Sequence, residues 1–133
     1  MSEQDGDDEV LVVEDDPEIN ELVGAYVEIA GFRYRRAIDG AGALREARAH
    51  HPALIVLDVM LPDLDGFEIC RRLKSDRDTS DIPVVMLTAL DREEHRARGV
   101  QCGAASYLTK PFDPDRLMQA IRDNAHTNHR QAH

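Results

Sequence analysis

The chain has 133 residues, of which 42% are hydrophobic, so it can bury one core without disulfide or metal cross-links. Its 26 acidic and 16 basic residues give a net charge of −10, which argues against direct binding to nucleic acid or to anionic membranes. Cys70 and Cys102 have no paired spacing, and no signal or membrane-spanning run is present, so we expect a cytoplasmic protein.

Along the chain, short β-favouring runs alternate with segments of helical periodicity. Residues 1–9 predict a disordered acidic tail and residues 126–133 a polar C-terminal tail, which leaves one domain at 10–125. Strands are predicted at residues 10–13, 33–37, 54–57, 84–87 and 106–108. The first helix is opened by Asp16 as N-cap and by Pro17, and it is closed by Gly31. Further helices are predicted at residues 41–49, 66–73, 92–100 and 114–124.

The composition of each strand predicts its place in a sheet. Residues 10–13, 54–57 and 84–87 are continuously apolar, as in parallel strands that helices cover on both faces. The strand at 33–37 is rich in arginine and alternates poorly, so we expect it at an edge. The predicted fold class is therefore α/β, a doubly wound five-stranded parallel sheet of order 2-1-3-4-5 with five helices, as in flavodoxin-like folds.

In such a sheet the ligand site lies beyond the carboxyl ends of the central strands. The predicted strand ends carry the following side chains: Glu14, Asp15, Asp16, Asp58, Thr88 and Lys110. Three consecutive acids after a buried strand can form a solvated turn, a helix cap, a metal site or a mixture of these. We assign Asp16 to the helix cap, which leaves Glu14 and Asp15 for a hard divalent cation such as Mg²⁺.

Four segments carry a resemblance to a known family: VLVVEDD, LIVLDVMLPDLDG, VVMLTAL and YLTKPF. They resemble, in order and at suitable spacing, the signature segments of the bacterial two-component response-regulator receiver domain, of the chemotaxis-regulator (CheY-like) type. The resemblance spans about residues 10–125. Each segment alone is a weak signal, whereas the four together are specific.

The resemblance implies that Asp58 accepts a phosphoryl group from a phosphohistidine. It implies a Mg²⁺ ion, replaceable by Mn²⁺, and no other cofactor. The implied metal ligands are Glu14, Asp15, Asp58 and the backbone carbonyl of Met60. Thr88 and Lys110 match the positions that bind the phosphoryl oxygens, Thr88 and Tyr107 match the switch positions, and the bond between Lys110 and Pro111 is expected to be cis.

The implied partners are a sensor histidine kinase or a histidine phosphotransfer protein, and an unidentified downstream target. Phosphorylation would alter partner binding through the surface of helix 4, strand 5 and helix 5. We expect a signalling phosphoacceptor and not an enzyme, although it assists its own phosphorylation and dephosphorylation. We also expect a monomer or a phosphorylation-dependent homodimer and, from the length alone, a stand-alone protein.

Other functions and simpler roles remain open at this point. The same residues would suit a magnesium-dependent phosphate-handling enzyme with an aspartyl nucleophile, or a binding module that keeps the fold without being phosphorylated. Thr88 could cap the fourth helix, and Tyr107 could be a static core aromatic. Against the enzyme, the sequence offers no cap domain or long loops to enclose a substrate, and against the binding module, the acids, Thr88 and Lys110 are all present.

Overall fold

A computed structural model describes residues 8–88 and 101–131 of the chain. Its elements are β1 (Glu9–Val13), α1 (Pro17–Ile29), β2 (Arg33–Ala37), α2 (Gly40–His50), β3 (Leu54–Asp58), α3 (Gly66–Ser75), β4 (Val84–Thr88), β5 (Ser106–Thr109) and α5 (Pro114–Gln131). The predicted helix at 92–100 lies outside the described residues, which contain four helices where the sequence predicts five for the whole chain.

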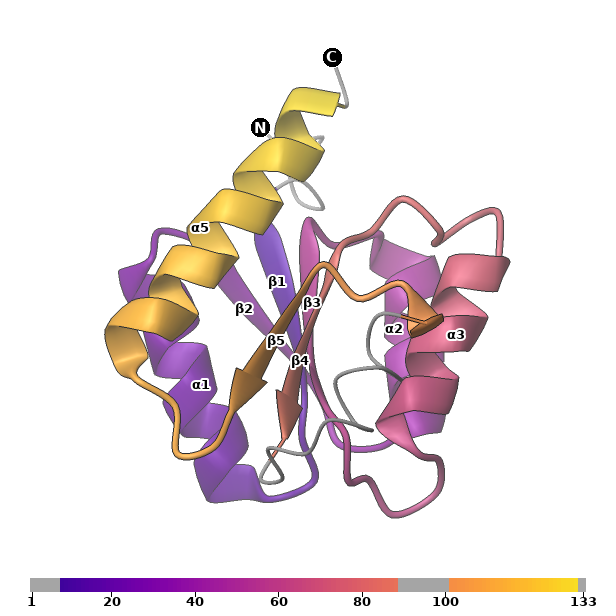
Figure 1. Ribbon diagram of the computed structural model, residues 1–133, viewed down its shortest axis with the longest axis horizontal. Coiled ribbons are helices and arrows are strands. Elements are labelled where there is room, and N and C mark those ends of the chain that lie inside the picture. The colour runs from indigo at the N-terminus through magenta and orange to yellow at the C-terminus, as the bar shows by residue number, and fades with distance from the viewer. Residues whose placement is uncertain (1–7, 89–100, 132–133) are drawn as a thin grey trace.

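The five strands form one parallel sheet in the order β2-β1-β3-β4-β5, which confirms the predicted order and the edge position of β2. Helices α1 and α5 cover one face of the sheet, and α2 and α3 cover the other (Figure 1). All strands therefore end at the same edge of the sheet (Figure 1). Within the described ranges, no helix is long and apolar enough to cross a lipid bilayer.

The core consists of two hydrophobic clusters, one on each face of the sheet. Successive residues of β1 alternate between them, because Leu11 and Val13 belong to the cluster under α2 and α3 while Val10 and Val12 belong to the one under α1 and α5. Full burial of one such aliphatic side chain stabilises the fold by about 1.5–3 kcal/mol. The continuous apolar runs of the central strands thus hold both helix layers and fix where each strand ends.

Helix α1 begins and ends as the sequence predicts. The Asp16 carboxylate accepts hydrogen bonds from the backbone N–H groups of Glu18, at 2.9 Å, and of Ile19, at 3.4 Å, so Asp16 is the N-cap. Pro17 occupies the first helical position, where no backbone N–H is needed. Gly31 follows the C-cap with a φ of 102°, a left-handed conformation that glycine adopts without strain.

Glu9, which the sequence places in the disordered tail, is the first residue of β1 and is buried. The boundary predicted between tail and domain is therefore wrong at this residue. An acid can begin a buried strand here because Arg35 of β2 donates from Nε to Oε1 of Glu9 at 2.8 Å. Arg33, opposite Glu9 in the register, adds a weaker ion pair at 3.9 Å.

Helix α5 extends to Gln131, whereas the sequence predicts its end at Asn124 and a tail from His126. The predicted end is wrong because no glycine or proline follows Asn124 within the helix. Once a helix is nucleated by packing, as α5 is by Leu117 and Ile121, each added residue gains one backbone hydrogen bond.

Candidate functional site at the carboxyl edge of the sheet

Four polar side chains come from strand ends at one edge of the sheet. Asp58 is the last residue of β3 and Thr88 is the last residue of β4. Glu14 directly follows β1, and Lys110 directly follows β5. The parallel arrangement therefore brings groups from four separate segments to a single place, although 96 residues separate Glu14 from Lys110.

Lys110 joins the two buried carboxylates of this edge. Its Nζ donates to Oδ2 of Asp58 at 2.9 Å and to Oε1 of Glu14 at 3.0 Å. Only 4% of the Glu14 side chain and 6% of the Asp58 side chain are exposed, compared with 20% for Lys110. Removal of the ammonium would leave two carboxylates unpaired where water scarcely reaches, which is costly.

The protonation behaviour of the site reflects an excess of acid. Burial, together with the hydrogen bond to Asp58, raises the pKa of Glu14 to about 7, although bonds from the Asp16 backbone and from Lys110 act in the opposite direction. Burial alone would lower the pKa of Lys110, but its hydrogen bonds to Asp58 and Glu14 raise it above its ordinary value. Lys110 therefore stays positively charged, while Glu14 lacks a full counter-charge.

Both oxygens of the Asp58 carboxylate are oriented. Oδ1 accepts from the backbone N–H of Met60 at 3.0 Å, and Oδ2 accepts from Lys110. Helix α3 supports the same segment, because Gly66 begins that helix and donates its N–H to the Val59 carbonyl at 2.8 Å. Asp65 is the N-cap of α3, through a 2.7 Å bond from Phe67 N to its carboxylate.

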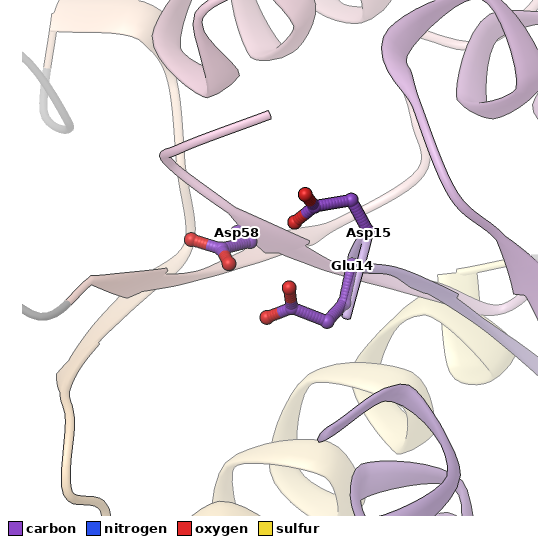
Figure 2. A group of neighbouring side chains, drawn as sticks. All are labelled: Glu14, Asp15 and Asp58. Carbon is purple, nitrogen blue, oxygen red and sulfur yellow. The ribbon is translucent and has the colours of Figure 1, made fainter. Parts of the chain in front are cut away.

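Glu14, Asp15 and Asp58 form a group suited to a cation. One carboxylate oxygen from each residue lies within 4.8 Å of the other two, and Figure 2 shows the three carboxylates close together and pointing to the same side. Asp15 is exposed and the other two are buried, so the group opens to solvent on one side. When all three are ionised, a single ammonium leaves two negative charges in excess.

The donor set fits Mg²⁺, which prefers oxygen ligands, keeps several waters and would balance this excess charge. Met60 is 64% exposed, and the use of its backbone carbonyl as a metal ligand stays a prediction. Asp16 accepts bonds from the start of α1 and does not belong to the three-carboxylate group. The three acids after β1 thus divide between a helix cap and a candidate metal site.

The two residues predicted as a switch lie on neighbouring strands. Thr88 is fully buried, and its carbonyl accepts from Lys110 N at 2.6 Å. Tyr107 of β5 is half-buried against the cluster under α2 and α3, and Met86 of β4 stands opposite it in the register. The bond between Lys110 and Pro111 is cis, as predicted.

Sequence reasoning missed two polar residues beside the site. The Asp63 carboxylate accepts from the backbone N–H groups of Gly40, at 2.7 Å, and Ala41, at 3.0 Å, and these bonds hold the pKa of Asp63 below its usual range. Asp63 thereby ties the loop after β3 to the start of α2. Asn20 is fully buried in α1, next to the apolar position Ile19; its polar side chain among apolar helix positions was the signal that could have revealed it.

Comparisons with known proteins agree on one family. A family model described as the response regulator receiver domain matches residues 10–122. The DNA-binding dual master transcriptional regulator RpaA of Synechocystis is 44% identical over 113 residues, which make up 85% of this chain and 47% of that relative. The structure is similar to the chemotaxis protein CheY4 of Vibrio cholerae, with 30% identity, a TM-score of 0.81 and coverage of 87% of this chain and 97% of that chain.

A further solved structure bears on the metal. It is the receiver domain of the sensor histidine kinase PA1611 from Pseudomonas aeruginosa, with a magnesium ion coordinated in its active-site cleft. The similarity has a TM-score of 0.82 with 29% identity, and it covers 90% of this chain and 98% of that chain. A magnesium ion is thus bound by a protein with the same fold and a related sequence.

The chain spans about half the length of the curated relatives it matches. Those relatives are named as transcriptional regulators, and RpaA is named as binding DNA. The expectation of no direct contact with nucleic acid is therefore not supported. The net charge of this chain describes only the half of each relative that it matches, and the other half of such a relative can bind DNA. The expectation of a stand-alone protein stays a prediction.

Proposed function

The chain belongs to the response regulator receiver domain family of two-component signalling, and we propose that Asp58 is the side chain that accepts its phosphoryl group. The observation that carries this proposal is the environment of the Asp58 carboxylate. It is buried at a strand end, it is held by Met60 N–H and Lys110 Nζ, and it lies beside the two other carboxylates of the group. A structural aspartate in a turn would need neither the ammonium nor the neighbouring acids.

The proposed reaction requires little beyond positioning and charge compensation. An Asp58 oxygen attacks the phosphorus of a phosphohistidine, the O–P bond forms, and the P–N bond breaks with its electron pair returning to the imidazole. Lys110 is already placed on Oδ2 of Asp58, so its charge offsets the repulsion between carboxylate and phosphoryl group. Magnesium, when bound by Glu14, Asp15, Asp58 and the Met60 carbonyl, supplies the remaining positive charge; Mn²⁺ would serve in its place.

After transfer, the site would hold an acyl phosphate with up to two negative charges and three acceptor oxygens. Lys110 would keep one oxygen neutralised and the Thr88 hydroxyl would donate to another. Thr88 and Tyr107 lie on adjacent strands, so a movement of the end of β4 would change the packing of the Tyr107 ring. We propose that partner binding responds through β5, α5 and the segment before β5.

The proposed partners follow from this chemistry. The donor is a histidine kinase or a histidine phosphotransfer protein in the cytoplasm. The phosphorylated chain is then bound by a downstream protein or by a second copy of the chain. The chain acts as a phosphoacceptor that assists its own phosphorylation and hydrolysis, and it does not turn over an external substrate.

The proposal is tested by intact mass spectrometry after incubation with magnesium and acetyl phosphate. We expect one phosphoryl addition in the wild type and none in Asp58→Asn or in wild type treated with a chelator. Asp63→Asn is the matched control, because it removes an exposed carboxylate from the same loop and should still be modified. An addition that persists in Asp58→Asn would show that another side chain is the acceptor.

A further inference from the structure

Asn20 is a buried amide that contacts the segment carrying the acidic pair. None of its surface is exposed, and it lies in the first turns of α1. Its Nδ2 donates to the Glu14 carbonyl at 2.9 Å and to the Ala37 carbonyl at 3.0 Å, with a longer contact to the Val12 carbonyl at 3.4 Å. A buried amide is costly unless it is hydrogen-bonded, so these contacts fix its place.

Tyr34 of β2 fixes the orientation of this amide. Its hydroxyl is hydrogen-bonded to Oδ1 of Asn20. Backbone carbonyls accept only, so the amide nitrogen must face them, and the Tyr34 hydroxyl must then donate to the amide oxygen. Burial raises the pKa of Tyr34, which keeps the donated proton on the hydroxyl. Donors and acceptors are thus matched along the whole chain of bonds from Tyr34 to Glu14.

The carbonyl that Asn20 binds belongs to the peptide unit joining Glu14 to Asp15. A peptide unit is planar, so fixing the direction of its C=O fixes the plane between the two acids. On the other side, Glu14 N donates to the Ala37 carbonyl at 3.1 Å, the same carbonyl that Asn20 binds. The backbone is therefore held on both sides of Glu14, and this sets the directions in which the side chains of Glu14 and Asp15 leave it.

We propose that Asn20, held by Tyr34, is the positioning residue that sets the geometry in which Glu14 and Asp15 receive a divalent cation. The inference rests on the proposed function, because it assumes that the acidic group binds magnesium. Mg²⁺ demands near-octahedral ligands, so a small rotation of either acid lowers its affinity. Groups that orient metal ligands without contacting the metal themselves change the metal affinity by about 10–100-fold when they are removed.

Gly24, which lies outside the acidic group, contacts Tyr34 and so supports the same assignment. A β carbon at this position would lie 2.5 Å from two atoms of the Tyr34 ring, so the ring rests directly on the backbone of α1. Glycine is unfavourable inside a helix, and contact with the ring accounts for its presence here. Gly24→Ala would displace Tyr34 without touching Asn20 or the acids, and it should weaken magnesium binding in the same direction as Tyr34→Phe.

The test is a magnesium titration by calorimetry on the full chain, with folding checked by circular dichroism. Asn20→Ala should bind magnesium about 10–100-fold more weakly. Tyr34→Phe keeps the ring and should lose about three- to tenfold, the worth of one hydrogen bond. The control is Tyr26→Phe, which removes the hydroxyl of a tyrosine whose ring packs on Phe112, and it should stay within about twofold of the wild type.

Two further readouts separate positioning from a general loss of stability. If Tyr34 acts only through Asn20, the double variant should bind magnesium no more weakly than Asn20→Ala alone. The amide of Asp15, which shares the peptide unit with the Glu14 carbonyl, should exchange its hydrogen faster in both single variants, and it should not do so in Tyr26→Phe.

Two results would overturn the inference while leaving the proposed function intact. The first is a wild type that binds magnesium together with a folded Asn20→Ala or Tyr34→Phe of equal affinity. The second is additive losses in the double variant, which would remove Tyr34 from the assignment. If Asn20→Ala fails to fold, Tyr34→Phe decides, because its ring fills the same space. A folded wild type that binds no magnesium would overturn both the inference and the metal site of the proposed function.

Discussion

Gly66 approaches the backbone of the candidate acceptor so closely that one added methyl group should disturb the site. A β carbon at Gly66 would lie 2.4 Å from the Asp58 carbonyl oxygen and 2.7 Å from Val59 Cα, both rigid backbone atoms. Ordinary contact begins at 3.4 Å, so Gly66→Ala must move α3 and the end of β3 apart by about 1 Å. The hydrogen bond from Gly66 N to the Val59 carbonyl would be stretched at the same time.

The expected cost follows from this displacement. Forcing extra volume into a packed site costs about 1–3 kcal/mol, so the free energy of unfolding of Gly66→Ala should fall by about 2 kcal/mol in urea denaturation. Because Asp58 moves with the backbone, magnesium affinity measured by calorimetry should fall by about tenfold or more.

Gly31→Ala is the matched control. Gly31 has a φ of 102° and no atom within 4 Å of an added β carbon, so alanine there costs about 1–2 kcal/mol through backbone strain alone. It should destabilise the fold by a similar amount and leave magnesium binding unchanged. If Gly66→Ala matches the wild type in both assays, or if Gly31→Ala weakens magnesium binding as much as Gly66→Ala does, the close approach of Gly66 does not set the geometry of the site.

Three more outcomes are expected. Lys110→Met leaves Glu14 and Asp58 buried without an ammonium, so urea denaturation in chelator should show a loss of about 3 kcal/mol; an unchanged midpoint would contradict the ion-pair geometry. Asp15→Asn should weaken magnesium binding while Asp16→Asn, which keeps the helix cap, should not; equal effects would remove the assignment of Asp16 to the cap. Magnesium at about 100 times its dissociation constant should stabilise the wild type by about 2.7 kcal/mol, reversibly with chelator, and no stabilisation would argue against the site.

Much of the fold could be predicted because the composition of each strand determines where that strand can lie in the sheet. The apolar runs of β1, β3 and β4 can be buried only between two helix layers, and the arginine-rich β2 can be tolerated only at an edge. Parallel strands end on one side of the sheet, so the grouping of Glu14, Asp15 and Asp58 follows from the strand ends alone. The cap at Asp16 follows from its place directly before Pro17.

What the sequence could not provide are contacts between distant residues. Glu9 belongs to β1 because Arg35 binds it across the strand pair, and nothing near Glu9 in the sequence indicates this. The sequence marks Asn20 only as a polar residue among apolar helix positions, and its partners, Tyr34 and the Glu14 carbonyl, are visible only in the structure. Such partners depend on the register between strands and on how helices pack against them, and neither is visible in a single stretch of sequence.

Chemical trapping shows directly whether Asp58 carries the phosphoryl group. Borohydride reduces an acyl phosphate to an alcohol, so the phosphorylated wild type should yield homoserine at position 58 in peptide mapping by mass spectrometry. We expect this product only when magnesium and a phosphodonor are both present. Homoserine or a stable phosphate at any other residue, with position 58 unmodified, would contradict it.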